Sequence, residues 1–153
     1  MPNEKLLLVT DLDATLLNKD YTWNDAEKTI GRLKKLGFPI IFNSSKTHLE
    51  MRDLSLEMEN IVPIIGENGG TLAIPAGWPQ AAEPEADYSI EVKGIERREI
   101  CSFAHELRKE KGYDFGGFSD WSVAELQSRT GLSERQAKQA QARHATEPII
   151  WNE

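Results

Sequence analysis

The stretch KLLLVTDLDATL, residues 5–16, decides the fold that this chain is expected to adopt. Its first half, residues 5–10, is a continuous apolar run, which is typical of a strand buried on both faces of a parallel sheet. Two carboxylates, Asp11 and Asp13, follow directly. Residues that come just after a strand of an open α/β sheet lie at its carboxyl edge, where such sheets bind ligands. The stretch therefore predicts a buried strand with a candidate polar site at its end.

The segments that follow continue in the order expected of such a sheet. A helix comes next, opened by a capping box of Thr22 and Asp25 and ended by Gly37. Apolar runs at residues 38–42 and 61–65 are predicted to be strands, and a second helix is expected between them. Strand, helix, strand, helix, strand predicts an α/β fold with an open parallel sheet.

A change in composition predicts a second unit. Residues 75–84 hold three prolines and a glycine, which is typical of a linker, so we expect one unit at 1–80 and another at 85–153. The elements expected in the second unit are a strand at 88–92, a helix ended by Gly112, a strand at 115–118, two helices opened by capping boxes (Ser122 with Glu125, Ser133 with Gln136) and a strand at 147–151.

The composition also excludes several classes of protein. The 153 residues carry 18 Lys plus Arg against 25 Asp plus Glu, a net charge of −7, which argues against a partner such as nucleic acid or an anionic membrane. The apolar runs are too short to span a bilayer, and the N-terminus does not resemble a signal peptide. We therefore expect a cytoplasmic protein that acts on a small molecule.

Asp11 and Asp13 are the strongest candidates for chemistry. Two carboxylates at positions i and i+2 can divide labour, one attacking as a nucleophile while the other gives and takes a proton. Their charge also suits Mg²⁺, which prefers oxygen ligands. A solvated, Asp-rich turn is the alternative interpretation, but the position directly after the first strand favours a functional site.

A second motif adds to the first. Ser44 ends the next expected strand within FNSSKT, residues 42–47, and its hydroxyl could donate to a phosphoryl oxygen. Alone, this segment is more typical of a helix N-cap. Together, the two motifs resemble those of the haloacid dehalogenase (HAD) superfamily of aspartate-nucleophile phosphohydrolases. GENGG at 66–70, and SERQA, Arg143 and EPIIW further on, narrow the resemblance to the mannosyl-3-phosphoglycerate phosphatases.

The resemblance implies a Rossmann-like parallel sheet core, incomplete in this chain, with an inserted α/β cap over the active site. Asp11 would then form an aspartyl-phosphate, while Asp13 would protonate the leaving oxygen and afterwards activate water. The Asp11 carboxylate and the Asp13 backbone carbonyl would hold Mg²⁺. Thr15, Ser44 and Ser45 would bind phosphoryl oxygens. Ala14 stands where the family more often has Gly, so its φ is expected to stay below zero.

The resemblance also implies roles towards a phosphorylated sugar-glycerate substrate. Lys46 would bind its second anionic group, and Arg143 its glycerate carboxylate. Glu67, Asn68 and Gly69 would contact the sugar hydroxyls. The alternative interpretation is that Lys46 and Arg143 are solvated surface residues.

Two features of the family are missing from the sequence. A Lys that follows the cap and a later acidic motif, which complete the site, do not occur after Trp151. We therefore expect the N-terminal portion of a longer phosphatase, with the strand at 5–10 as an exposed edge capable of self-association. A related sugar-phosphate phosphatase or phosphomutase, and a catalytically inactive binding fragment, are the alternatives.

Overall fold

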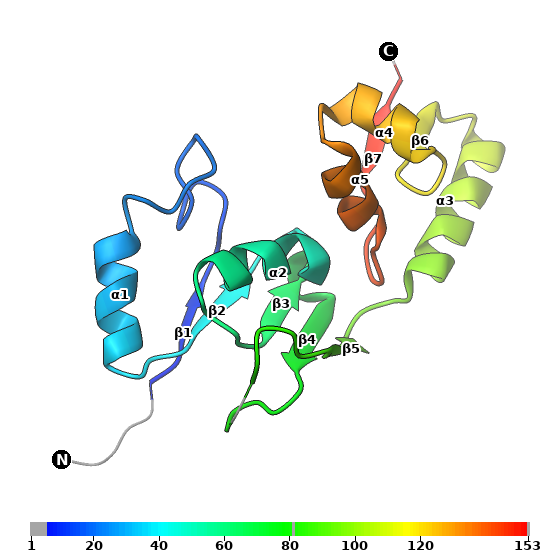
Figure 1. The fold of residues 1–153 in the computed structure, drawn as a ribbon. Helices are drawn as coiled ribbons and strands as arrows, with labels where there is room; N and C mark the ends of the chain where they lie inside the picture. Colours follow the sequence, from blue (N-terminus) through cyan, green and yellow to red (C-terminus); the bar gives the residue numbers. More distant parts are fainter. Residues whose placement is uncertain (1–5, 81, 153) are drawn as a thin grey trace.

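The computed structural model describes residues 6–80 and 82–152 and shows an α/β fold, as predicted (Figure 1). A five-stranded sheet has the order β1-β2-β3-β4-β5, and a two-stranded sheet pairs β6 with β7. The strands are β1 Leu8–Thr10, β2 Ile40–Asn43, β3 Ile64–Gly66, β4 Thr71–Pro75, β5 Tyr88–Val92, β6 Phe115–Gly117 and β7 Ile149–Trp151. The helices are α1 Glu27–Lys35, α2 His48–Glu57, the short η1 Glu67–Gly69, α3 Arg97–Lys111, α4 Val123–Thr130 and α5 Glu134–Gln141.

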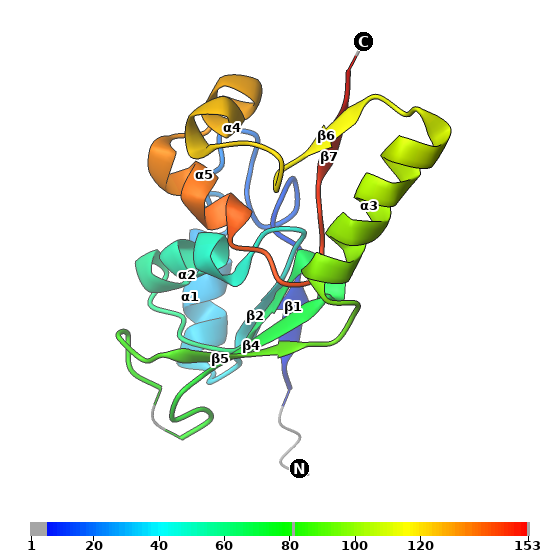
Figure 2. The ribbon, with the colours of Figure 1, turned by 90° about the vertical axis from the view of Figure 1, so that its right-hand side faces the viewer.

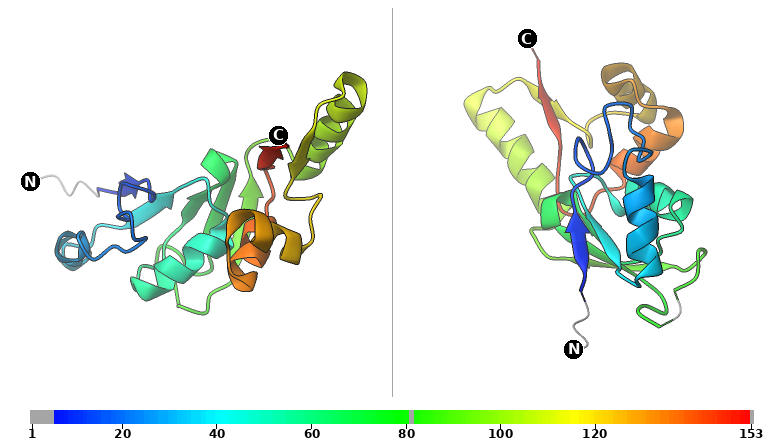
Figure 3. Two further views of the ribbon diagram at one scale, coloured as in Figure 1. Left: turned by 90° about the horizontal axis from the view of Figure 1, so that it is seen from above. Right: turned by 90° about the vertical axis from the view of Figure 1, so that its left-hand side faces the viewer.

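The first three strands are parallel, and their carboxyl ends meet at one edge. Thr10 lies opposite Phe42 in the register of β1 and β2, and Phe42 lies opposite Ile64 in that of β2 and β3. Asp11, which follows β1, and Asn43, the last residue of β2, therefore share that edge. Helices α1 and α2 lie on one face of the sheet (Figures 2 and 3). This arrangement brings the polar segments that follow β1, β2 and β3 together.

The hydrophobic core lies between this sheet and its two helices. Phe42 of β2 is fully buried, and burial of a side chain of this size contributes about 2–3 kcal/mol to stability. The buried cluster around it consists of Leu12, Leu17, Ile30, Ile40, Met51, Met58, Ile64 and Ala73. Leu12 belongs to this cluster although it lies between Asp11 and Asp13, so the aspartate loop is anchored in the core.

Strand β1 differs from the predicted strand buried on both faces. It lies at the edge of the sheet, and Leu8 and Val9 are 41% and 46% exposed. The expected strand began at Lys5, which lies outside the described residues. The apolar run was correctly predicted to be a strand, but its burial requires a neighbour on the side away from β2.

Two local predictions in the first unit need correction. Helix α1 begins after Ala26, which makes no side-chain cap, and Thr22 and Asp25 do not form a capping box. Instead, Asn18 accepts from the Thr22 backbone N–H and donates to Asp25. Strand β4 was not predicted. Its buried positions alternate, and it pairs antiparallel with β3 across η1.

In the structure, we call residues 6–80 and 82–92, up to the end of β5, the first unit, and residues 97–151, from α3 to β7, the second unit. The predicted capping boxes of Ser122 with Glu125 and of Ser133 with Gln136 are both present. Helix α3 ends at Gly112, whose φ of 66° is left-handed, as a helix terminator requires. Among the described residues, the helices are too short or too polar to cross a bilayer.

The second unit rests on the first through α5. Gln139 donates to Asp53 of α2, and Thr47 donates to the Gln139 backbone carbonyl. Strand β5, which was expected to open the predicted unit at 85–153, pairs along its whole length with β4 in the larger sheet. The division at 1–80 and 85–153 remains a prediction.

Candidate active site

The aspartate loop turns tightly around buried Leu12. The backbone N–H groups of Thr15 and Leu17 both donate to the Leu12 carbonyl, at 3.2 and 2.8 Å. Asp11 is exposed, and its Oδ2 accepts a 3.0 Å hydrogen bond from Thr15 Oγ1. The nucleophile expected from the sequence is thus held by a hydroxyl in the same loop.

Ala14 departs from its expected conformation. Its φ is +56° rather than negative. The left-handed region is unfavourable for a residue with a Cβ atom, by about 1–2 kcal/mol. The return of the chain from Asp13 to Thr15 requires this conformation, which explains why a glycine suits the position.

Asp13 faces the loop after β2. Its Oδ2 forms an ion pair with Lys46 Nζ, which also lies 5.6 Å from the centre of the Tyr21 ring. Asp13 Oδ1 is buried and has no hydrogen-bond partner among the described residues. The structure therefore brings together two side chains that are 33 positions apart in the chain.

The loop of Ser44, Ser45 and Lys46 leads into α2. Ser44 is only 4% exposed, and its Oγ accepts from the Lys46 backbone N–H at 3.3 Å. The N-cap of α2 is Thr47, which forms a capping box with Glu50. Because Thr47 is the N-cap of α2, Ser44 and Ser45 do not cap the helix. Both serines lie at the carboxyl edge of the sheet.

Asp11 and Asp13 offer oxygen atoms, which are the type of ligand that Mg²⁺ prefers. Mg²⁺ is usually bound by one or two carboxylates together with several waters, and the buried Oδ1 of Asp13 lacks a partner. Within residues 6–80 and 82–152 there is no group of three or more His, Cys, Asp or Glu residues able to hold a metal ion. The described donors thus fit part of a magnesium site.

Glu67 occupies a different environment from the one expected of a sugar-binding residue. It is 1% exposed, and its carboxylate accepts from the backbone N–H groups of His144 and Ala145 and from Thr146 Oγ1. Burial raises the pKa of this carboxyl, but these hydrogen bonds outweigh burial and hold its pKa below the ordinary value. The sugar contact that the resemblance implies for Glu67 stays a prediction, and the structure places its carboxylate on residues 144–146.

A cavity of about 590 Å³ lies between the two units. Three of the expected site residues, Ser45, Asn68 and Arg143, line it. Gly69 follows Asn68 in η1, and both have left-handed φ values, 86° and 57°. The remaining lining residues are Ile100, Phe118, Ala145, Thr146, Glu147 and Pro148.

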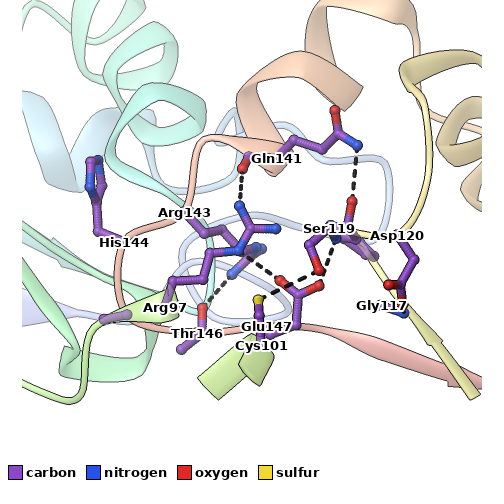
Figure 4. Close-up of polar contacts among 12 residues, drawn as sticks. Arg97, Cys101, Gly117, Ser119, Asp120, Gln141, Arg143, His144, Thr146 and Glu147 are labelled. Atoms are coloured by element: carbon purple, nitrogen blue, oxygen red, sulfur yellow. Dashed lines mark hydrogen bonds and ion pairs between the residues drawn. The ribbon is translucent and has the colours of Figure 1, made fainter. Parts of the chain in front are cut away.

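Arg143 is the cationic group of this cavity. Its Nη1 donates to the Ser45 carbonyl at 3.1 Å and to Thr146 Oγ1 at 2.9 Å, as Figure 4 shows for the Thr146 contact. Its Nε is buried without a partner among the described residues. Burial lowers the pKa of the guanidinium, and Glu50 and Glu67 nearby oppose this effect. Arg143 is therefore not the solvated surface residue of the alternative interpretation.

Sequence reasoning missed Phe118 and Thr146 at this cavity. The guanidinium of Arg143 lies 5.6 Å from the centre of the Phe118 ring, and Thr146 links Arg143 to Glu67. The spacing of three residues between Arg143 and Thr146 could have suggested, weakly, that their side chains meet. The contact between Thr146 and Glu67 joins residues 79 positions apart, and no local sequence pattern predicts it.

Comparison with known families finds one model that matches residues 8–144, described as haloacid dehalogenase-like hydrolase. A curated relative from Persephonella marina, a glucosyl-3-phosphoglycerate/mannosyl-3-phosphoglycerate phosphatase, is 34% identical over 149 residues. The match covers 95% of this chain and 55% of the relative. The chain thus spans about half the length of the relative.

Solved structures agree on the fold. A haloacid dehalogenase-like hydrolase from B. subtilis aligns with a TM-score of 0.53 at 16% identity, over 88% of this chain and 50% of that one. Another, from Bacteroides thetaiotaomicron, has a TM-score of 0.52 at 20% identity, over 73% of this chain and 40% of that one. At these identities the alignments support the architecture alone.

Proposed function

Because this chain belongs to the haloacid dehalogenase-like hydrolases, we propose that it takes part in the hydrolysis of a phosphate monoester of a sugar-glycerate. Mannosyl-3-phosphoglycerate is the first candidate substrate, and glucosyl-3-phosphoglycerate is the second. The name and identity of the P. marina relative support this choice.

The observation that carries the proposal is the contact between Asp13 and Lys46. It joins the aspartate loop after β1 to the loop after β2, which holds Ser44. The contact supports the proposal because the residues proposed as nucleophile, acid–base group, hydroxyl donor and cation come from these two neighbouring loops. Phosphoryl transfer requires mainly such positioning and charge stabilisation.

The proposed reaction has two steps. An Asp11 oxygen attacks phosphorus and the bond to the substrate oxygen breaks, while Asp13 gives that oxygen a proton. Water then attacks the phosphorus of the aspartyl-phosphate and loses a proton to Asp13, and the bond to Asp11 breaks. Ser44 and Ser45 donate hydrogen bonds to the phosphoryl oxygens. Thr15 holds the Asp11 carboxylate in place before attack.

We propose that Asp11, through its carboxylate, and Asp13, through its backbone carbonyl, hold Mg²⁺ together with water. When bound, the ion would neutralise charge on the phosphoryl oxygens. Lys46, beside Asp13, supplies a further positive charge from the chain itself.

The cavity supports a substrate with a second anionic group. Arg143 lines the cavity with its guanidinium, and a carboxylate is a suitable partner for that cation. Asn68, exposed at η1, offers an amide to sugar hydroxyls. A glycerate carboxylate beside Arg143 and a sugar beside Asn68 would fill this space.

The test is phosphate release from a panel of substrates by the purified chain, with Mg²⁺ and with EDTA. We expect release from mannosyl- or glucosyl-3-phosphoglycerate that requires Mg²⁺ and exceeds release from simple hexose phosphates. A preference for hexose phosphates would favour a related sugar-phosphate phosphatase, and transfer of phosphate within the sugar would favour a phosphomutase.

A second candidate function is sugar-phosphate binding without turnover. The cavity lined by Ser45, Asn68 and Arg143 favours it, because neither Asp11 nor Asp13 is among its lining residues, so a ligand could bind there without chemistry at Asp11. It predicts no phosphate release from any substrate of the panel, but calorimetric binding of mannosyl-3-phosphoglycerate that Arg143→Met weakens.

A further inference from the structure

We propose that Glu67 is a positioning residue that holds residues 143–146, here called the strap, so that Arg143 and Thr146 line the cavity. This inference rests on the proposed function, because it concerns the affinity of the same cavity for its substrate. Glu67 itself is buried under the strap and does not face the cavity.

Three hydrogen bonds join Glu67 to the strap. The backbone N–H of His144 donates to Oε1 at 2.8 Å, and that of Ala145 donates to Oε2 at 3.0 Å. Thr146 Oγ1 donates to Oε2 at 2.7 Å. Hydrogen bonds to an ionised acceptor are stronger than those to a neutral one. Here one carboxylate accepts hydrogen bonds from three successive residues of the strap.

The same bonds orient the cavity-lining side chains. Thr146 Oγ1 donates to Glu67 and accepts from Arg143 Nη1 at 2.9 Å. Arg143 also donates to the carbonyl of Ser45, in the loop between β2 and α2. The hydroxyl of Thr146 is therefore a relay between a buried carboxylate of the first unit and the cation of the cavity.

The backbone directly after η1, at Gly70, lies close against the strap. A Cβ atom at Gly70 would lie 2.7 Å from Ala145 Cβ, which is closer than two carbon atoms can approach. The φ of Gly70 is −68°, which any residue can adopt. The absence of a side chain at this position thus serves the close approach of the strap.

Two substitutions separate the effect of the Glu67 carboxylate from the effect of close packing between Gly70 and the strap. Glu67→Ala removes the acceptor, and Gly70→Ala keeps the acceptor but forces the strap outward. The matched control is Glu110→Gln on the exposed side of α3. Amide hydrogen exchange at His144 and Ala145 reports directly on the two backbone bonds, and it does not depend on activity.

We expect exchange of both amides to be about tenfold faster or more in Glu67→Ala and Gly70→Ala than in the wild type and in Glu110→Gln. We also expect Thr146→Val to raise KM for mannosyl-3-phosphoglycerate by about tenfold with kcat little changed, and Thr146→Ser to restore it.

Unchanged protection of the two amides in Glu67→Ala would overturn the positioning role, whatever the activity. An equal KM for Thr146→Val and the wild type would overturn the relay to Arg143. Absence of phosphate release by the wild type would overturn the proposed function but not the exchange result, so the two failures are distinguishable.

Discussion

Lys46 forms an ion pair with Asp13, and this contact joins the loops that follow the first two parallel strands. Asp13 is the expected acid–base residue, and Lys46 is the expected partner of a substrate anion. The structure therefore connects two residues that were assigned separate tasks. Substrate binding and proton transfer are expected to depend on the same lysine.

Lys46→Met is expected to reduce activity far more than stability. The two side chains are 26% and 41% exposed, so the loss in unfolding free energy should stay below about 1 kcal/mol. We expect kcat/KM for the sugar-glycerate phosphate to fall by about tenfold or more. Denaturant unfolding and steady-state kinetics measure the two quantities. Lys93→Met, which removes an exposed pair with Glu91, is the control and should change neither. A loss of kcat/KM of less than twofold would exclude the shared role.

Ala14→Gly is expected to stabilise the chain. The residue has a φ of +56°, and glycine adopts such a value without a steric penalty, so unfolding free energy should rise by about 1 kcal/mol or a little less. The matched control is Ala124→Gly on α4, a helical position where glycine should cost about 1 kcal/mol. Equal losses at both positions in urea unfolding would contradict the left-handed assignment.

Much of this fold follows from local patterns. Each of the helices predicted at α2, α3, α4 and α5 is present because apolar spacing and caps such as Ser122 with Glu125 are local signals. The burial of β1 was predicted wrongly, because burial depends on which strand lies next to it. Strand β4 was missed because GENGG and the prolines after it are also typical of loops.

The exposed edge at β1 is expected to promote self-association. Leu7 and Val9 are 54% and 46% exposed, and β1 is the edge strand of the sheet within the described residues. Such an edge is a template for another strand. Val9→Lys should therefore lower the fraction of dimers and larger species in sedimentation velocity. Ile95→Lys, at an apolar residue that is 61% exposed outside the sheet, is the control. The same distribution for wild type and Val9→Lys would argue against association through this edge.

The site was less predictable than the fold. The sequence motifs predicted that Asp11, Asp13, Ser44 and Lys46 lie at one edge of the sheet, because the carboxyl ends of parallel strands lie together. The role of Glu67 depends on a segment 79 positions away. Contacts between distant segments leave no periodic pattern in the sequence. The sequence therefore marked Glu67 as a candidate site residue, but it could not predict the hydrogen bonds of Glu67 to residues 144–146.

The contribution of Glu67 to stability is expected to depend on pH. Because hydrogen bonds hold its folded pKa below the ordinary value of 4.5, its contribution is complete above that value and declines as the pH falls through the lower folded pKa. The charged and titratable groups around it are Arg143, His144 and, from α2, His48. Chemical unfolding of the wild type and Glu67→Gln from pH 7 to pH 3 measures the difference. We expect the wild type to be about 2 kcal/mol more stable at neutral pH, with a smaller difference in acid. A difference that grows in acid would contradict the assigned direction of the pKa.

The most direct test of the central claim is to look for phosphate on Asp11. The chain is incubated with mannosyl-3-phosphoglycerate and Mg²⁺, quenched in acid and digested, and the peptide containing Asp11 is analysed by mass spectrometry. We predict one added phosphoryl group on Asp11 in the wild type, and neither this adduct nor phosphate release in Asp11→Asn. Phosphate release that persists in Asp11→Asn would contradict the account.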